Sequence, residues 1–269
     1  MPMFNHRNLW PVYVSLFSLS ASVWANTLPW QGPYAGVYLG GGFGNNNIST
    51  NAGSVTNSSF FTTSADINAV NQAGTWWKET STVIVGLQAG HDWIWKQMVY
   101  GAALDYGALS LSSSTRSYNN YPDNSDQYSV NTSVRSNWLL TLRGRVGYQK
   151  MLKSSTLFYL TGGMAITRLE VSNSFIDNSY LVGMSRNEAV QNQIGWAAGG
   201  GIDVAAFNHV TVNIEYLYIG IPSIKTISSI TNTQGGFGIP VQSMNNALST
   251  TANFYANIFK IGLNYRFDE

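Results

Sequence analysis

The sequence predicts an all-β fold, namely an eight-stranded antiparallel transmembrane β-barrel with four long extracellular loops and short periplasmic turns. Apolar and polar residues alternate with a period of two along eight segments, and a strand sends successive side chains to opposite faces. The connections between these segments are alternately short and long. Charged residues make up 10% of the chain, against about 25% in soluble domains, which indicates a surface that largely avoids water.

The first residues predict a secretory signal peptide. The chain begins with a segment that carries Arg7 and no acid, followed by mostly apolar residues 9–24 and the small residue Ala25. This pattern predicts a signal peptide over residues 1–25 and an outer-membrane barrel domain over residues 26–269. A transmembrane helix is the alternative, but the apolar run is short for a span and ends at a small-residue cleavage site.

Composition excludes several other classes. After residue 25 no apolar stretch approaches the roughly 18 residues of a membrane helix, whereas a barrel disperses its apolar half over alternate positions. A net charge of +1 provides no basic surface, so we expect no nucleic-acid partner. The chain has no cysteine, so it has no disulfide framework, which suits an oxidising periplasmic route.

The strands and connections follow in order along the chain. The predicted strands are 34–44, 82–94, 98–111, 137–149, 156–171, 193–205, 210–219 and 253–267. Each is near or above the roughly 9–11 residues that a tilted strand needs to cross the hydrocarbon. The predicted tight turns are 95–97, 150–155 and 206–209, and the predicted long loops are 45–81, 112–136, 172–192 and 220–252. An even number of strands places both termini on the short-turn, periplasmic side.

Aromatic residues gather near the ends of these strands. Amphipathic rings favour the headgroup zone of a membrane, so two girdles are expected. The predicted girdle on the short-turn side comprises Trp93, Trp95, Tyr100, Tyr148, Phe158, Tyr265 and Phe267. The predicted girdle on the loop side comprises Trp138, Trp196 and Tyr218.

The end of the chain carries the most specific pattern. Lys260, Gly262, Tyr265 and Phe267 stand in the order polar-x-Gly-x-x-aromatic-x-aromatic on a strictly alternating segment. This pattern resembles the carboxy-terminal assembly signal of bacterial outer-membrane β-barrels, although here two acids follow the final aromatic. The resemblance implies that the barrel-assembly machinery is a partner.

The whole predicted barrel resembles one group of surface proteins. The entry segment Trp30-x-Gly32-Pro33-Tyr34-x-Gly36-x-Tyr38-x-Gly40-Gly41 is similar to the first strand of the small outer-membrane barrels typified by the OmpA transmembrane domain and the opacity-type, porin-family proteins. The resemblance implies a bacterial outer-membrane location with extracellular loops, and outer-membrane lipid and lipopolysaccharide as partners. It implies no single activity, because one fold hosts many functions.

Phasing the strands by their apolar face predicts a charged interior. The predicted lumen network is Asp92, Asp105, Arg143, Arg145, Asp203, Glu215, Lys260 and Arg266, with Gln88 beside it. Four acids and four bases make the lumen neutral, and an eight-stranded barrel is only wide enough for side chains to fill. We expect these charges to pair and close the lumen. A narrow or gated ion path is the alternative, although a selective pore would show an excess of one sign.

The search for catalytic or metal-binding residues favours neither an enzyme nor a cofactor. The three histidines are His6 in the signal peptide, His91 on a lipid-facing position and His209 in a short turn, so none stands in a long loop. The sequence shows no cluster of His, Cys and carboxylate residues with metal-ligand spacing. We therefore predict that the protein is not an enzyme and binds no metal or cofactor.

The long loops are the predicted interaction surface. Their aromatic residues lie among Ser, Thr and Asn, a composition typical of adaptable recognition surfaces. The predicted recognition residues are Phe60, Phe61, Trp76, Trp77, Tyr118, Tyr121 and Tyr128. A host or surface ligand is the predicted partner, with loops that pack on each other or on lipopolysaccharide as the alternative. The predicted function is structural and adhesive, and a small low-conductance porin is the alternative.

Overall fold

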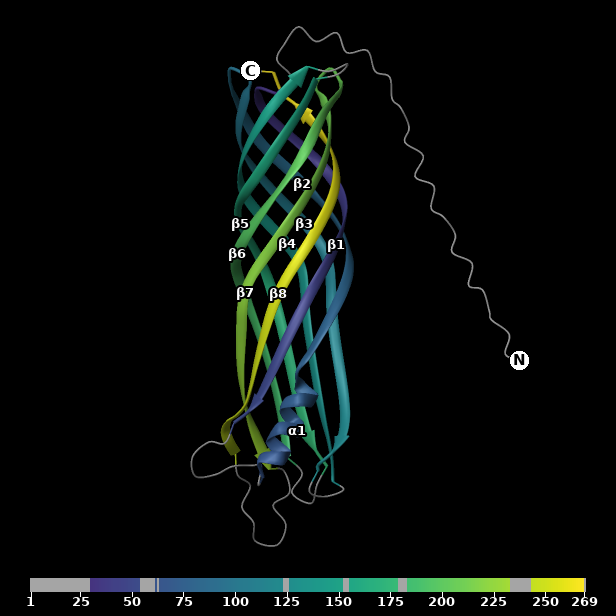
Figure 1. Ribbon diagram of the computed structural model, residues 1–269, viewed down its shortest axis with the longest axis vertical. Helices are drawn as coiled ribbons and strands as arrows, with labels where there is room; N and C mark the ends of the chain where they lie inside the picture. The colour runs from purple at the N-terminus through teal and green to yellow at the C-terminus, as the bar shows by residue number, and fades with distance from the viewer. Residues whose placement is uncertain are drawn as a thin grey trace, which may run out of the picture.

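The computed structural model describes residues 30–268, with gaps at 54–60, 62, 123–125, 152–154, 179–182 and 233–242. The described chain forms a closed barrel of eight antiparallel strands, in which each strand pairs with its neighbours in sequence and the last closes the ring on the first (Figure 1). The predicted all-β class and the eight-stranded antiparallel barrel are therefore confirmed. No helix among these residues is long and apolar enough to span a membrane.

The strands extend well beyond the predicted segments. They are β1 (Gly32–Ala52), β2 (Trp76–Trp95), β3 (Met98–Asn120), β4 (Gln127–Met151), β5 (Ser155–Asp177), β6 (Gly183–Phe207), β7 (Val210–Asn232) and β8 (Ser243–Arg266), with α1 (Ser64–Gly74) between β1 and β2. Their lengths of 20 to 25 residues are about twice what a membrane crossing requires. The segments predicted as long loops are therefore largely strand. Many of their Ser, Thr and Asn residues occupy alternate strand positions, which sequence composition alone does not distinguish from loops.

Two tight turns define one end of the barrel, called here the turn end; the opposite end is the loop end. The β2–β3 turn contains Lys96 with φ 58°, and the β6–β7 turn contains His209 with φ 68°. Left-handed backbone of this kind fits short hairpin connections, whose twist matches that of the strands. Both turns lie where they were predicted, whereas residues 152–154 of the third predicted turn fall outside the described residues.

The outer surface near the turn end is an apolar band between two sets of aromatic rings. Trp93 and Trp95 are 54% and 65% exposed near the turns. Toward the loop end, the rings of Trp196 and Tyr218 lie 5.3 Å apart, and Trp138 stacks near Tyr106. Rings at both borders of an apolar band mark the two membrane–water interfaces. The strands therefore cross the membrane near the turn end and continue past it at the loop end.

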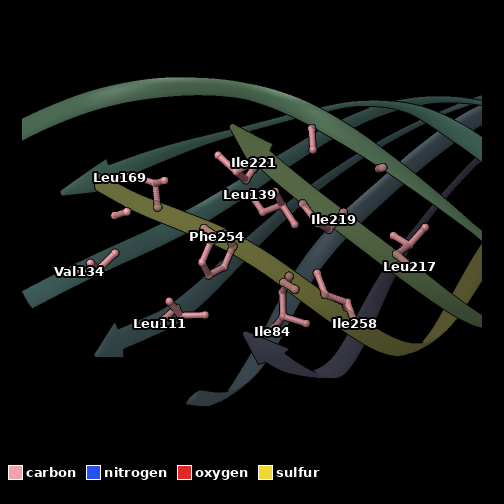
Figure 2. Close-up of a cluster of buried hydrophobic side chains, with 14 of the residues drawn as sticks. Ile84, Leu111, Val134, Leu139, Leu169, Leu217, Ile219, Ile221, Phe254 and Ile258 are labelled. Carbon is pink, nitrogen blue, oxygen red and sulfur yellow. The ribbon is translucent and has the colours of Figure 1, made fainter. Parts of the chain in front are cut away.

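In the half of the barrel toward the loop end, the interior is a hydrophobic core (Figure 2). Its main cluster includes Leu111, Leu169, Ile221 and Phe254, all almost completely buried. A second cluster lies at the loop end itself, where Val70 of α1 is fully buried among side chains from the strands. The helix thus fills the loop end of the barrel.

Local chemistry explains how α1 is held. The side chain of Thr63 caps the helix by accepting a hydrogen bond from the backbone N–H of Asp66. At the other end, the hydroxyl of Thr50 donates to the carbonyl of Gly74 at 2.9 Å. A Cβ at Gly74 would come within 2.5 Å of the Thr50 side chain, so only glycine permits this approach of α1 to β1.

Among the described residues, the backbone pairing has two long gaps toward the loop end. Pairing between β2 and β3 ends at Ile84 and Leu109, although β2 continues beside β1 and β3 continues beside β4. Pairing between β6 and β7 is interrupted beyond Trp196 and Gly220. Pro222 lies within β7, two residues after Gly220. Because proline has no N–H, it cannot donate a hydrogen bond to a neighbouring strand at this position.

Candidate functional site

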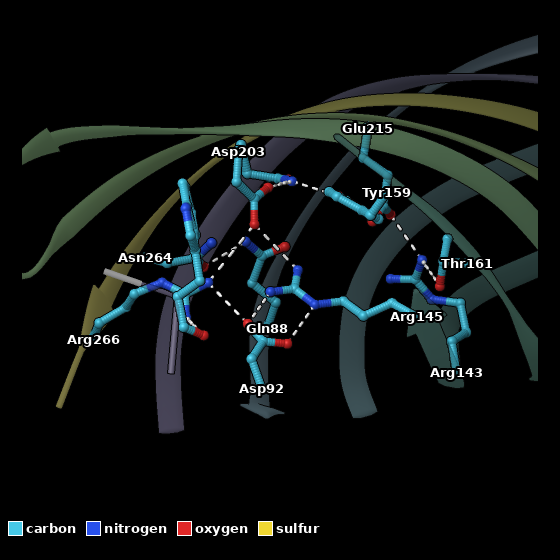
Figure 3. Close-up of polar contacts among 12 residues, drawn as sticks. Gln88, Asp92, Arg143, Arg145, Tyr159, Thr161, Asp203, Glu215, Asn264 and Arg266 are labelled. Atoms are coloured by element: carbon cyan, nitrogen blue, oxygen red, sulfur yellow. Dashed lines mark hydrogen bonds and ion pairs between the residues drawn. The ribbon is translucent and has the colours of Figure 1, made fainter. Parts of the chain in front are cut away.

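The lumen of the membrane-crossing half holds a two-layer network of charged side chains. The eight charged residues predicted for the lumen all point into it, and each is at most 7% exposed. They come from six different strands. Their side chains occupy inward-facing strand positions, so they meet in the same part of the lumen (Figure 3). The close-up shows how the guanidinium groups of Arg145 and Arg143 reach across the barrel from β4.

The first layer lies nearest the turn end and contains Asp92, Arg145, Asp203 and Arg266. Arg145 Nε donates to Asp92 Oδ1 at 2.6 Å, its Nη2 contacts the other oxygen of the same carboxylate, and its Nη1 donates to Asp203 Oδ2 at 3.1 Å. Arg266 Nη2 donates to Asp92 Oδ2 at 3.0 Å. Two cations therefore hold two carboxylates in a closed group, with a bidentate pair of the strongest kind.

The second layer contains Asp105, Arg143, Glu215 and Lys260. Arg143 contacts Asp105 and donates from Nη1 to Glu215 Oε1 at 2.9 Å. Lys260 Nζ lies 2.6 Å from Asp105 Oδ2 and 2.9 Å from Glu215 Oε1. Each carboxylate contacts both cations, so neither acid nor base is left uncompensated in this buried layer.

Aromatic side chains complete the charged layers. The Arg145 guanidinium lies 4.8 Å from the ring of Tyr34 and 5.0 Å from that of Tyr159, and Lys260 Nζ lies 4.6 Å from the ring of Tyr38. The Tyr159 hydroxyl also donates to Glu215 at 2.8 Å. These aromatic residues were not predicted as part of the network. Their period-two spacing with the inward residues is the signal that identifies them.

Trp30 covers the turn end of the lumen. It is fully buried, its indole Nε1 donates to Ser155 Oγ at 2.8 Å, and its carbonyl accepts from Arg266 Nη1 at 3.0 Å. Its ring lies 5.0 Å from the Arg266 guanidinium. Sequence reasoning placed Trp30 in a strand-entry motif and missed this role, because the residue precedes the alternating segment.

The described lumen is thus filled at successive levels from Trp30 to α1. Within the hydrophobic core lies a cavity of about 20 Å³, lined by Gly42, Thr82, Ile84, Leu111 and neighbouring residues. A cavity of this size holds about one water molecule. The arrangement can therefore fix the barrel as a rigid, plugged cylinder.

The residues of the predicted assembly signal divide between the two faces of β8. Lys260 and Gly262 face the lumen, whereas the rings of Tyr265 and Phe267 point outward, 50% and 48% exposed, with centroids 5.1 Å apart. An outward aromatic pair at the turn end is accessible to a partner within the membrane.

The two described histidines lie toward the turn end. His91 faces outward with its ring 4.5 Å from that of Trp93. His209 stacks on Tyr265, and its Nε2 lies 2.9 Å from Asp268 Oδ1. His6 lies outside the described residues. Across the described ranges, no three His, Cys, Asp or Glu residues gather in an arrangement that could hold a metal ion.

The predicted recognition surface must be corrected. Phe61, Tyr121 and Tyr128 are 5%, 7% and 2% exposed, because they face inward and pack in the cluster around α1. Trp76 is partly buried against the main hydrophobic core. Phe60 lies outside the described residues. The aromatic residues were predicted to be exposed because their segments were taken as loops, whereas they lie on or beside strands with an inward face.

Two predicted recognition residues do present an exposed ring. Trp77 on β2 and Tyr118 on β3 are 62% and 66% exposed. By contrast, the Tyr121 hydroxyl is inside and donates to Asp177 Oδ2 at 3.1 Å. Burial, and then the Asp177 carboxylate, raise the pKa of Tyr121, so this phenol stays protonated and keeps its hydrogen bond.

The fold and the filled lumen together define an integral membrane β-barrel with a closed, charge-paired interior. The outer membrane protein beta-barrel domain family matches residues 12–267, and the chain belongs to this family. It is therefore a protein of the bacterial outer membrane. None of the curated proteins matches the chain.

Three solved structures that match the chain are each distant from it in sequence. Ail, the attachment invasion locus protein of Yersinia pestis, is 8% identical with a TM-score of 0.34, over 88% of this chain and 99% of that one. OprG of Pseudomonas aeruginosa is 12% identical with a TM-score of 0.35, over 89% and 97%. The outer membrane protease OmpT of Escherichia coli is 12% identical with a TM-score of 0.38, over 90% and 99%.

Proposed function

We propose that the protein is a structural and surface-interaction protein of the outer membrane, whose plugged barrel carries its loop end out of the cell for adhesion or envelope contact. The observation that supports this proposal best is the filled lumen. Trp30, two layers of paired charges and a hydrophobic core follow one another along the described axis. A barrel filled in this way supports a rigid wall rather than a passage.

The charge balance of the lumen argues against a working pore. Arg143 and Lys260 are each paired with both Asp105 and Glu215, so an ion that entered would have to displace buried partners. A selective channel uses rings of one sign of charge, and this network has equal numbers of both. A small low-conductance porin is the alternative function.

Membrane partners follow from the outer surface. The apolar band near the turn end contacts outer-membrane lipid, and the loop end stands among lipopolysaccharide. The outward rings of Tyr265 and Phe267 serve the barrel-assembly machinery as its recognition element. Because both described histidines lie toward the turn end, we assign the loop end a binding role and no catalytic one.

Planar-bilayer conductance of the refolded protein tests this proposal. The expected result is no stepwise current from wild-type protein whose migration on SDS gels changes on boiling, as closed barrels resist SDS until heated. The variant Arg143→Ala is recorded beside it and should also carry no current, because Trp30, the first charged layer and the apolar core still fill the lumen. A porin of established conductance serves as the positive control for channel detection. Frequent, ion-selective openings of the wild type would establish the porin instead.

A further inference from the structure

The wall of the barrel has an unpaired stretch between β2 and β3, called here the seam, formed by residues 76–83 and 110–117. The last backbone pair of this ladder is Ile84 with Leu109. Beyond it, residues 76–83 pair only with β1 and residues 111–117 pair only with β4. Both strands therefore present an edge of backbone donors and acceptors to each other without joining.

Side chains bridge the seam, and the bridges lengthen toward the loop end. Next to the last pair, the Ser110 N–H donates to Thr82 Oγ1 at 3.2 Å. Farther along, the whole side chain of Lys78 crosses the seam to donate to the Ser114 carbonyl at 3.2 Å. Still farther, the Ser117 hydroxyl reaches the Ala73 carbonyl of α1 instead of β2. The bridging group thus changes from a short threonine side chain, to a whole lysine side chain, to a contact with α1, as expected for two strands that diverge toward the loop end.

Buried polar groups along the seam lack hydrogen-bond partners. If the pairing of Ile84 with Leu109 continued, Thr80 would face Ser113. Ser113 is 1% exposed, and neither its hydroxyl nor the hydroxyl of Thr80 has a partner among the described residues. The buried indole N–H of Trp76 is in the same situation. Buried groups of this kind favour a neighbour that can form hydrogen bonds, so an apolar chain would suit the seam poorly.

The outer rim of the seam has the composition of a binding site. Trp77 and Tyr118 expose 62% and 66% of their surface, and the Arg116 guanidinium lies 5.0 Å from the Tyr118 ring. Aromatic residues and arginine supply most of the energy at protein interfaces. Lys78 and Arg116 provide two cations against the single acid Glu79, which favours an acidic partner.

We propose that the seam binds an extended, acidic peptide segment of a partner protein by strand addition between β2 and β3. The peptide backbone pairs with the two free edges, its inward polar side chains reach Thr80 and Ser113, and its outward side chains cover Trp77 and Tyr118. An acidic side chain of the peptide pairs with the ammonium group of Lys78, which then no longer donates to the Ser114 carbonyl. The inference deepens the proposed surface-interaction function and gives it a location and a class of partner.

The first experiment selects ligands without assuming their sequence. A phage-displayed library of random dodecapeptides is panned against the full protein in lipid nanodiscs, with empty nanodiscs as the background. The expected result is enrichment of peptides that alternate polar and apolar residues and carry Asp or Glu. No enrichment above empty nanodiscs would overturn the proposal.

The second experiment locates the binding of an enriched peptide, made synthetically. Trp77→Ala with Tyr118→Ala, and separately Lys78→Glu, should each weaken it at least about tenfold, as hot-spot losses do. The matched control Ile227→Ala removes a similarly exposed side chain from β7 and should leave affinity unchanged. All variants alter exposed side chains, and heat-dependent migration on gels confirms that each one folds. Equal weakening by the control would refute the location.

The mode of binding is tested with the same peptide carrying N-methyl groups on alternate amides. Backbone pairing predicts at least about tenfold weaker binding of the methylated peptide, and slowed hydrogen exchange in residues 110–117 with the normal one. Equal binding of both peptides, or displacement by dodecanoate that identifies the seam as a lipid slot, would overturn strand addition. Conductance is recorded separately, so a conducting barrel that still binds peptide would refute only the closed-barrel function.

Discussion

The two halves of this barrel use the same strands with opposite polarity. In the half near the turn end, residues such as Leu39 and Ile261 face outward at 61% exposure, while Arg143 and Asp203 are buried inside. In the half near the loop end, Leu169 and Phe254 are inside, while Arg135 and Arg168 face outward. The surroundings of each half explain the inversion, since the first half faces the hydrocarbon of the membrane and the second lies outside it.

The comparison shows that two kinds of core maintain one cylinder. The charged core depends on partners, because each buried ion needs its counter-ion. Loss of one ion leaves the other buried and uncompensated. The apolar core depends on volume, because a removed side chain leaves a cavity that its neighbours only partly fill. Substitutions should therefore differ between the halves in magnitude and in the rule that sets the magnitude.

The largest effect is expected from Arg143→Ala in the charged half. Asp105 and Glu215 would keep Lys260 as their only cation, and leaving a buried charge uncompensated costs about 3–5 kcal/mol. Urea unfolding in micelles should show this loss. Little loss of stability together with a marked change in single-channel current would show that the layer is a pore lining and not a core.

A somewhat smaller effect is expected from Leu169→Ala in the apolar half. The side chain is 2% exposed in the main hydrophobic cluster, and such truncations cost about 2–4 kcal/mol through lost burial and a residual cavity. Urea unfolding measures it, with the lipid-facing Leu39→Ala as control. A loss no greater than that of the control would mean that this half has no tight core.

Glu215→Gln should cost less than Arg143→Ala and sharpens the rule for the charged half. The amide oxygen can still accept from Arg143 Nη1, so the loss is the charge and one poorly matched hydrogen bond, about 1–3 kcal/mol. The double variant Arg143→Ala, Glu215→Gln should lose less stability than the sum of the two single losses, because the two residues are direct partners. Additive losses in urea unfolding would contradict the observed pairing.

Val70→Ala should affect the loop end alone. The side chain is fully buried between α1 and the strands, and removal of two methyl groups costs about 1–2 kcal/mol. The helix should then open locally, which hydrogen exchange of residues 64–74 would detect. If hydrogen exchange rises equally in the strands, α1 unfolds together with the barrel and is not a separate unit at the loop end.

The smallest effect on stability is expected at the end of the chain. Asp268 contacts His209 Nε2 at the surface, and exposed contacts of this kind contribute about 0–1 kcal/mol. Deletion of the last two residues should leave outer-membrane yield unchanged or improved, whereas Phe267→Ala should lower it, as measured by membrane fractionation. The reverse ranking would show that the terminal aromatic pattern is not the assembly signal.

Much of the fold could be predicted because the alternation that identifies a strand is visible within a short stretch of sequence. Period-two alternation places Gln88, Asp92 and Lys260 on one face without any knowledge of neighbours, and the spacing of turns sets the number of strands. The same phase put the charged side chains inside, where all eight now lie. The sequence alone thus determined the barrel, its strand count and the content of its membrane-crossing lumen.

Only the tertiary structure decided where the lipid-facing band ends and the polarity inverts. Alternation is identical in both halves, so Tyr128 and Phe175 look like loop aromatics until the closed ring shows that they meet inside. The pairing of Arg143 with Asp105 and Glu215, the cover formed by Trp30 and the open seam between β2 and β3 depend on residues far apart in sequence. Which side chains meet across a closed ring is set by register and shear, which arise from all eight strands at once and from no local segment.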